Sequence, residues 1–158
     1  MDNTKQIPTL KYTKPISLNP SHNTPVLITG GAGFIGSNLV RFLLQHGYYL
    51  TVLDNFSSGN LDYLKGLPLD IVKGDILDRE LMINLLAKQS AVVHLAAQTG
   101  VPNSVVNPFS DCHQNVLGTL TVLDSCRVAG TPRFILASSN APLGNHSPPA
   151  TEDKVPRP

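Results

Sequence analysis

Short apolar runs alternate with longer amphipathic segments along most of the chain. Runs of four to six mostly apolar residues predict strands, and apolar residues recurring every three or four positions predict helices. The expected strands are Val26–Thr29, Tyr49–Asp54, Leu69–Lys73, Ala91–Leu95 and Arg133–Ser138. The expected helices are Phe34–Gln45, Leu61–Leu64, Asp78–Lys88 and Phe109–Ala129. This alternation predicts right-handed crossovers, and therefore a Rossmann-like, doubly wound α/β fold whose parallel sheet has about five strands.

Residues that favour helix caps mark the ends of two predicted helices. Asp78 is a favourable N-cap, because its carboxylate can accept a hydrogen bond from a backbone N–H of the first turn. Gly130, followed by Pro132, is typical of a helix stop. Between Pro102 and Pro108 we expect a loop. The helix from Phe109 is expected to turn one apolar stripe toward the core: Val116, Leu120, Leu123 and Cys126.

Proline gathers at the two ends of the chain and is sparse between them. Residues 1–24 are polar and aperiodic, so we expect a flexible lead there. Residues 25–145 contain every predicted strand and helix and form the expected domain. Residues 146–158 are expected to form a proline-rich loop.

Three glycines span the end of the first strand and the start of the first helix. Gly30 permits a tight turn, Gly33 lets phosphates approach the backbone, and Gly36 lets the helix pack closely on the strand. In this setting the helix N-terminus faces a dinucleotide pyrophosphate. The pattern therefore predicts a dinucleotide site, and an ordinary glycine-rich turn is the alternative.

Asp54 ends the second predicted strand, about 20 positions after the glycines. An acidic residue at this place accepts hydrogen bonds from the adenosine ribose hydroxyls. Its carboxylate would repel the 2′-phosphate of NADP, and no arginine lies close by in the sequence. We therefore expect NAD as the cofactor, with a polar cap on the strand end as the alternative role of this residue.

Composition narrows the choice of partners. The chain has 158 residues, 41% of them hydrophobic, and a net charge of +1. Without a long basic run, nucleic acid is not the expected partner. No apolar run approaches the ~20 residues that cross a bilayer, and the N-terminus lacks the apolar run of a signal peptide. Cys112 and Cys126 fall in one predicted helix, too far apart for a disulfide and without metal-ligand spacing, so we expect a cytoplasmic protein without a metal site.

Further motifs follow the glycines in a characteristic order. They are TGGAGFIG at 29–36, DNFSSG at 54–59, GDILD at 74–78, HLAAQTGVPNSVVNP at 94–108, NVLGT at 115–119 and ASSNAPLG at 137–144. With these motifs the chain resembles the extended short-chain dehydrogenases, specifically the NAD-dependent sugar-nucleotide epimerase/dehydratase family. The resemblance covers about residues 26 to 156. Leu143 departs from the family pattern, which often has tyrosine there.

The resemblance implies a role for each candidate residue. Around the pyrophosphate it places Phe34 and Ile35; around the adenosine ribose, Asp54, Asn55, Phe56, Ser57, Ser58 and Gly59; at the adenine, Asp75 and Ile76. On the nicotinamide side it places Leu95, Ala96 and Ala97, with Thr99 where some epimerases carry a ribose-contacting lysine, and Asn115 reaching toward the cofactor or a strand. Ser139 matches the family's catalytic serine or threonine, whereas His94 is expected to be a hydrogen-bonded core histidine.

The candidates fall where the fold would gather them. Gly30, Asp54, Asp75, Ala96 and Ser139 all lie at or just past the ends of predicted strands. In an open parallel sheet, ligands bind outside the carboxyl ends of the strands. A single edge of the sheet is therefore expected to carry the site.

The resemblance also implies an activity, which is hydride transfer at C4 of a nucleotide sugar. The expected substrate is a UDP-sugar, and a homodimer is one possible oligomeric state. The family chemistry needs a Tyr-x-x-x-Lys pair, and none of the four tyrosines here is followed by lysine four residues later. We therefore expect an NAD-binding portion truncated before the catalytic helix and the substrate-binding part, and inactive alone. A 4,6-dehydratase or decarboxylase, and a non-catalytic NAD-binding module, remain open alternatives.

Overall fold

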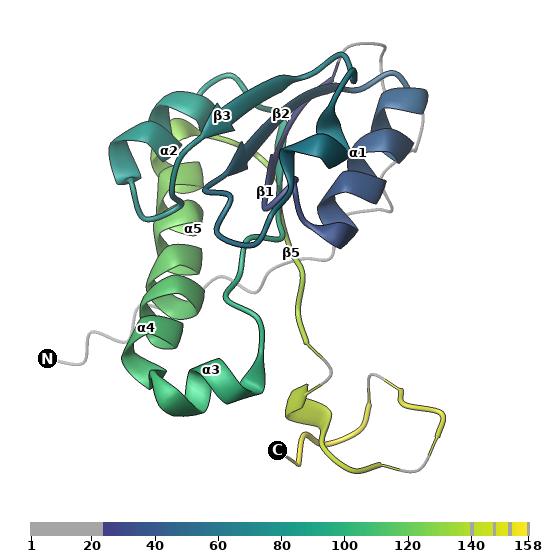
Figure 1. Ribbon diagram of the computed structural model, residues 1–158, viewed down its shortest axis with the longest axis vertical. Coiled ribbons are helices and arrows are strands. Elements are labelled where there is room, and N and C mark those ends of the chain that lie inside the picture. Colours follow the sequence, from purple (N-terminus) through teal and green to yellow (C-terminus); the bar gives the residue numbers. More distant parts are fainter. Residues whose placement is uncertain (1–23, 140, 147, 152, 158) are drawn as a thin grey trace, which may run out of the picture.

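Five parallel strands form one twisted sheet (Figure 1). The computed structural model describes residues 24–157 apart from 140, 147 and 152, so the expected lead at 1–24 lies almost wholly outside the described residues. The strand order is β3-β2-β1-β4-β5. The strands are β1 (Pro25–Thr29), β2 (Tyr49–Asp54), β3 (Asp70–Lys73), β4 (Ala91–His94) and β5 (Phe134–Leu136). The predicted Rossmann-like α/β fold is confirmed.

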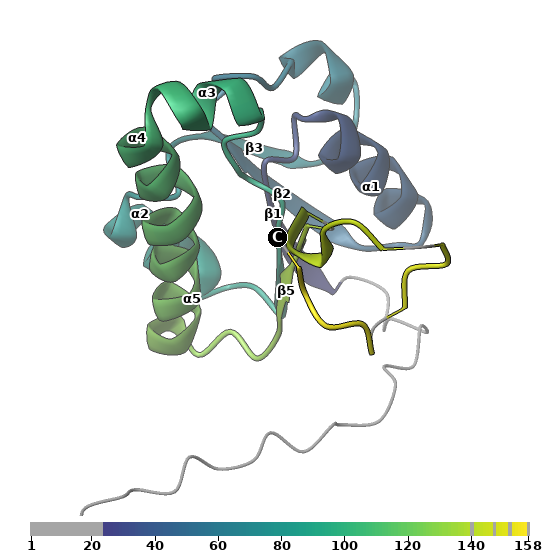
Figure 2. The ribbon, with the colours of Figure 1, turned by 90° about the horizontal axis from the view of Figure 1, so that it is seen from below.

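Helices cover both faces of the sheet (Figures 1 and 2). On one face lies α1 (Phe34–Gln45), whose Val40 joins an apolar cluster with residues of β1 and β2. On the other lie α2 (Arg79–Leu86) and α5 (Gly118–Ala129), which pack against each other and against the sheet. The two clusters give the domain a core on each side of a buried sheet, as parallel sheets require.

The strand order reverses between β1 and β4. The chain runs from β1 outward through β2 to β3, returns to β4 on the other side of β1, and continues to β5. Thr29 at the end of β1 pairs with Leu53 of β2 and with His94 of β4, so these three strands end at one level. A crevice forms at such a switch point, because the chain leaves the neighbouring strands in opposite directions.

The segment between Pro102 and Pro108 is helical, and the predicted loop is wrong. It forms α3 (Val101–Val106), and Pro108 is the first residue of α4 (Pro108–Cys112). Both prolines lie in a first helical turn, where the backbone N–H that proline lacks has no intrahelical partner anyway. Asn107 separates the helices and caps α4 by accepting a hydrogen bond from the Ser110 N–H.

The long helix predicted at 109–129 is interrupted by a π-helical turn at His113–Leu117, between α4 and α5. Its core-facing stripe was predicted two residues too early along most of the helix. The buried residues of α5 are Gly118, Val122, Ser125 and Cys126, which follow helical spacing from the glycine. Of the predicted stripe, only Cys126 is buried; Val116, Leu120 and Leu123 are about half exposed. The helix is apolar on two faces, and close approach at Gly118 decides which one packs on the sheet.

The remaining boundaries agree with the predictions to within two residues, and those of α1 and β2 match in full. Strand β5 keeps only Phe134–Leu136 of the predicted 133–138, and α2 spans Arg79–Leu86 rather than 78–88. The short 3-10 helix at Leu61–Leu64 is confirmed, and a further one at Ala141–Leu143 was not predicted. Asp78 caps α2 and left-handed Gly130 ends α5, as predicted. Within the described part of the chain, no helix is long and apolar enough to cross a membrane.

Candidate functional site

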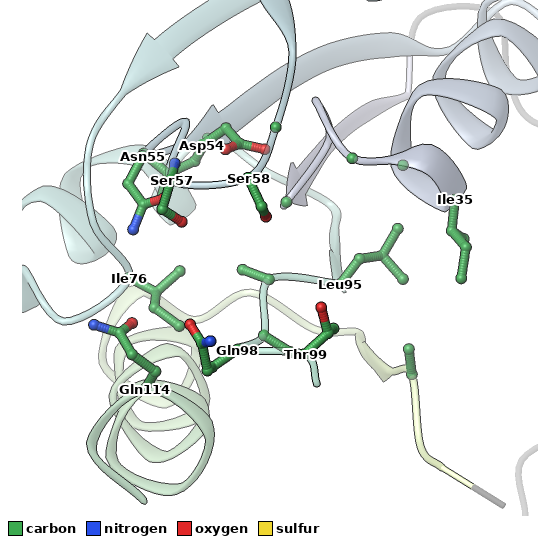
Figure 3. Close-up of a pocket in the computed structure, with 18 of the residues that line it drawn as sticks. Ile35, Asp54, Asn55, Ser57, Ser58, Ile76, Leu95, Gln98, Thr99 and Gln114 are labelled. Atoms are coloured by element: carbon green, nitrogen blue, oxygen red, sulfur yellow. The ribbon is translucent and has the colours of Figure 1, made fainter. Parts of the chain in front are cut away.

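A cleft of about 500 Å³ opens at the carboxyl ends of the central strands (Figure 3). It lies at the switch point between β1 and β4. Most of the predicted cofactor residues line it: Gly30, Gly33, Phe34, Ile35, Gly36, Asp54, Asn55, Ser57, Ser58, Gly59, Ile76, Leu95, Ala96, Ala97 and Thr99. The predicted candidates outside the lining are Phe56, Asp75, Asn115 and Ser139.

The glycine turn brings the ends of β1 and β4 close together. Gly30 has a left-handed φ of +71°, and a Cβ built there would lie 2.6 Å from the Ala96 backbone nitrogen. A Cβ on Gly36 would collide with the Gly30 carbonyl oxygen, so α1 packs directly on the turn. At Gly33 the nearest atom to such a Cβ is the Gly30 oxygen at 3.3 Å, and no second atom lies within 4 Å. Two glycines are therefore required by packing, and Gly33 leaves open space on the cleft side.

The N-terminus of α1 opens into the cleft without a cap. Gly33 holds the N-cap position, makes no side-chain hydrogen bond, and no acidic residue lies in the first turn. The first intrahelical bond runs from the Ser37 N–H to the Gly33 carbonyl, so the N–H groups of residues 34–36 have no helical acceptor. These N–H groups and the helix dipole favour an anion at this position.

Asp54 ties the end of β2 to the glycine turn. Its Oδ2 accepts a hydrogen bond from the Ala32 N–H at 2.9 Å, and its Oδ1 accepts one from the Phe56 N–H at 2.8 Å. The residue is 8% exposed and faces the cleft. Each carboxylate oxygen has two acceptor sites, so each retains one for a ligand hydroxyl. Among the described residues that line the cleft, none is lysine or arginine.

The loop after β2 wraps around this carboxylate. Phe56 adopts a left-handed φ of 59° and packs into the core of β1, β2 and α1, which explains why it does not line the cleft. Ser57 and Ser58 face the cleft, while a Cβ on Gly59 would lie 2.9 Å from an Asp54 oxygen. Asn55 bridges to the next strand end, because its side-chain amide donates to Asp75 Oδ2 at 3.1 Å. Asp75 thus holds the loop after β2 through Asn55 and does not itself line the cleft.

The opposite wall comes from the end of β4 and from the π-helical turn. Figure 3 shows Leu95, Gln98 and Thr99 facing the cleft, with Gln114 beside them. Asn115 holds this segment in place, because its Oδ1 accepts the Gln98 N–H at 2.8 Å and its Nδ2 donates to the Gln98 carbonyl at 3.0 Å. Asn115 therefore reaches a loop backbone and is absent from the cleft lining.

Ser139 lies past the cleft, three residues beyond the end of β5. Its hydroxyl accepts a hydrogen bond from the Ala141 N–H at 3.1 Å, and the residue is exposed. Ala137, two residues earlier, lines the cleft. The segment after β5 therefore reaches the cleft at Ala137. The Ser139 hydroxyl does not line the cleft and instead hydrogen-bonds to the nearby backbone.

Sequence reasoning missed part of the lining: Leu53, Gly74, Gln98, Ser110, Gln114 and Ala137. Ser110 and Gln114 precede Gly118 at intervals of four, but the sequence alone does not show that the helix packs on the sheet at Gly118. Gly118 approaches Ile76 so closely that a Cβ would lie 2.5 Å from its side chain. The helix face that packs on the sheet therefore continues, one and two turns earlier, into the cleft.

Comparison with known proteins identifies similar chains. The model of the NAD dependent epimerase/dehydratase family matches residues 26–158. A UDP-glucose 4-epimerase of Rhizobium leguminosarum bv. trifolii is 40% identical over 121 residues, covering 75% of this chain and 36% of that protein. A UDP-N-acetyl-alpha-D-glucosaminuronate decarboxylase of Bacillus cytotoxicus is 36% identical over 129 residues, covering 80% of this chain and 40% of that protein.

Solved structures agree with the sequence relatives. The crystal structure of UDP-glucose 4-epimerase from Brucella ovis in complex with NAD matches with a TM-score of 0.80 and 38% identity, over 85% of this chain and 42% of that one. The chain thus spans 36% to 42% of the length of these relatives. The resemblance read from the motifs is confirmed, since fold, sequence and family model agree over nearly all of the described residues. The chain belongs to the NAD dependent epimerase/dehydratase family.

Proposed function

We propose that the cleft binds NAD. The observation that carries the proposal is the pairing of an uncapped helix N-terminus with a ligand-facing carboxylate, joined by the bond between Asp54 and Ala32. An anion and a pair of hydroxyls are the groups that these two features recognise. A dinucleotide carries both, as a pyrophosphate flanked by riboses.

Each wall of the cleft has a part in this binding. The free N–H groups of Phe34, Ile35 and Gly36 hold the pyrophosphate, and the open face of Gly33 admits it. The carboxylate of Asp54 accepts the adenosine ribose hydroxyls and disfavours a 2′-phosphate. The remaining lining divides between the two ends of the cofactor: Asn55, Ser57, Ser58, Gly59 and Ile76 toward the adenosine, and Leu95, Ala96, Ala97 and Thr99 toward the nicotinamide.

For the whole protein we propose an NAD-dependent reaction on a nucleotide sugar, with C4 epimerisation of a UDP-sugar as the first candidate. The cofactor would supply a hydride acceptor and donor in this reaction. The epimerase relatives support the proposal. The motif resemblance also assigns to Ser139 the position of the family's catalytic serine or threonine. These 158 residues contain no Tyr-x-x-x-Lys, so we assign only cofactor binding to them.

Two other functions have a specific observation in their favour. Decarboxylation or dehydration of a similar nucleotide sugar is supported by the 36% identical decarboxylase relative. A non-catalytic NAD-binding module would need only a cofactor cleft, and the described residues form one. Turnover assays of the complete gene product with UDP-glucose and with UDP-glucuronate separate these three functions.

Calorimetric titration tests the cofactor proposal. NAD added to the purified chain is expected to bind to one site per molecule, and NADP is expected to bind at least ten-fold more weakly. Absence of binding heat for NAD at millimolar concentration, with the chain folded by circular dichroism, would contradict the proposal.

A further inference from the structure

A buried histidine directly precedes Leu95 and Ala96, on the side of the cleft where we place the nicotinamide. His94, the last residue of β4, is 2% exposed and stands between β1 and α5. Its Nδ1 is 2.6 Å from the Thr29 hydroxyl oxygen, and its Nε2 is 3.0 Å from the Thr119 hydroxyl oxygen. Both ring nitrogens are therefore occupied by residues from two different elements, and neither faces the cleft.

The hydrogen bonds continue from Thr29 into the cleft wall. The Thr29 hydroxyl oxygen accepts the Ala96 N–H at 3.3 Å, and Ala96 lines the cleft. Thr29 is fully buried, so its own hydroxyl proton needs an acceptor within the protein. His94 Nδ1 is the only acceptor that the structure gives it within the described residues. The direction of each hydrogen bond then follows. The Ala96 N–H donates to the Thr29 hydroxyl, the Thr29 hydroxyl donates to His94 Nδ1, and His94 Nε2–H donates to the Thr119 hydroxyl.

These hydrogen-bond directions require a neutral His94 ring. Burial lowers the pKa of His94 from 6.5 to about 4, so the ring is uncharged at pH 7 and its Nδ1 can act as an acceptor. Its other close neighbour is the ring of Phe134, with the centroids 6.0 Å apart. The two hydrogen-bond partners of the ring, Thr29 and Thr119, and the neighbouring ring of Phe134 carry no titratable group.

We propose that His94 is a positioning residue for the cofactor site, acting through the Thr29 hydroxyl on the Ala96 backbone. The Ala96 nitrogen lies where a Cβ on Gly30 would approach to 2.6 Å, so the β4 end and the glycine turn share one tight contact. A shift of Ala96 would alter the wall beside the glycine turn. The same ring reaches Thr119, which links that wall to α5. This role rests on the proposed function, because it concerns the shape of the cofactor site.

The first arm of the test needs no substitution. Nitrogen NMR of the histidine rings in the unsubstituted chain at pH 7 reports which ring nitrogen of His94 carries the proton. A neutral ring protonated at Nε2 is expected. A ring protonated at Nδ1, or at both nitrogens, would overturn the proposal, since Nδ1 could then not accept from Thr29.

The second arm removes the hydroxyl. Thr29→Val keeps the side-chain shape and is expected to speed hydrogen exchange of the Ala96 amide about ten-fold and to weaken NAD binding about three- to ten-fold. Thr29→Ser keeps the hydroxyl and is expected to change both by less than about two-fold. His94→Leu removes the ring acceptor and is expected to act in the same direction as Thr29→Val.

The third arm is a stability control on the same helix as Thr119. Val122→Ala leaves a cavity in the buried face of α5 without touching the network, and is expected to leave NAD affinity and Ala96 exchange unchanged. The proposal fails if Thr29→Val matches the unsubstituted chain, or if Val122→Ala weakens binding as much. If the unsubstituted chain binds no NAD, the proposed function fails, while Ala96 exchange still decides whether the network positions this segment.

Discussion

The Ala32 N–H donates a 2.9 Å hydrogen bond to Asp54 Oδ2, across 22 residues of sequence. This bond joins the glycine turn after β1 to the acidic end of β2. A dinucleotide needs both features at a fixed separation, because its pyrophosphate and its adenosine ribose are covalently linked. The bond therefore fixes the glycine turn and the Asp54 carboxylate relative to each other, as the dinucleotide binding that we propose would require.

Asp54→Asn is expected to weaken NAD binding at least ten-fold and to lower the free energy of unfolding by about 1–3 kcal/mol. An amide has one acceptor oxygen, so it cannot satisfy the N–H groups of both Ala32 and Phe56. It also carries no charge, so the preference for NAD over NADP is expected to shrink. Calorimetry with both cofactors and urea denaturation measure these effects.

The matched control for this prediction is Asp70→Asn, an exposed carboxylate at the start of β3 and away from the cleft. It is expected to change neither quantity measurably. Equal NAD affinities for the parent chain and Asp54→Asn would remove Asp54 from the ribose site.

The glycines of the turn are expected to respond differently to a single methyl group. Gly33→Ala fits the fold, because its Cβ meets only one atom at 3.3 Å, but it fills the side on which we place the pyrophosphate. Gly33→Val fills it further. We expect NAD binding to fall at least ten-fold with Gly33→Ala and to be abolished with Gly33→Val, with little change in the melting temperature.

Gly36→Ala serves as the opposite case, because its Cβ would collide with the Gly30 carbonyl oxygen. It is expected to lower the melting temperature strongly. If folded Gly33→Val binds NAD as the parent does, the open face at Gly33 is not the phosphate site.

Much of the fold and of this site could be predicted because it depends on local chemistry. The glycine turn, the strand-end Asp54 and the N-cap at Asp78 each combine a residue type with a backbone position that requires it. Such requirements are visible in a single sequence. The same holds for Gly130, whose left-handed conformation ends α5.

What could not be predicted depends on which surfaces meet in space. The helix at 108–129 is apolar on two faces, and only its contact with Ile76 at Gly118 selects the buried one. Gln114 enters the cleft for the same reason. The hydrogen bonds between Asn115 and the Gln98 backbone join the π-helical turn to the segment after β4, whose approach the sequence does not encode locally. Proline in a first turn was also misinterpreted as a loop signal at Pro102.

His94 is expected to make the fold sensitive to mild acid. The folded state holds this pKa near 4, whereas the unfolded chain titrates near 6.5, so the unfolded state binds the extra proton in between. The stabilisation is complete above pH 6.5 and is lost as the pH falls toward 4. Between pH 7 and pH 5 this group alone is expected to remove about 2 kcal/mol from the free energy of unfolding.

Urea denaturation at both pH values, for the parent chain and for His94→Asn, measures this loss. The variant lacks the titrating ring. Its free energy of unfolding is therefore expected to fall by about 2 kcal/mol less than that of the parent between pH 7 and pH 5. An equal pH dependence in both proteins would mean that His94 titrates normally in the fold.

Asp78→Ala separates stability from binding at a residue outside the cleft lining. The Asp78 carboxylate accepts the Leu81 N–H at 3.0 Å and caps α2. Its removal is expected to cost about 1 kcal/mol of unfolding free energy and to leave NAD affinity unchanged. Asp78→Ser, which keeps a capping oxygen, is expected to restore most of the loss. A stability equal to the parent's for Asp78→Ala would show that the cap contributes nothing.

The central claim is that the cleft at the carboxyl ends of β1, β2 and β4 is the dinucleotide site. Backbone amide NMR of the 17.0 kDa chain during an NAD titration tests it most directly. The largest shifts are expected at Gly33–Gly36, at Asn55–Gly59 and at Ala96–Thr99. No shifts at saturating NAD, or shifts confined to residues outside these three segments, would contradict the account.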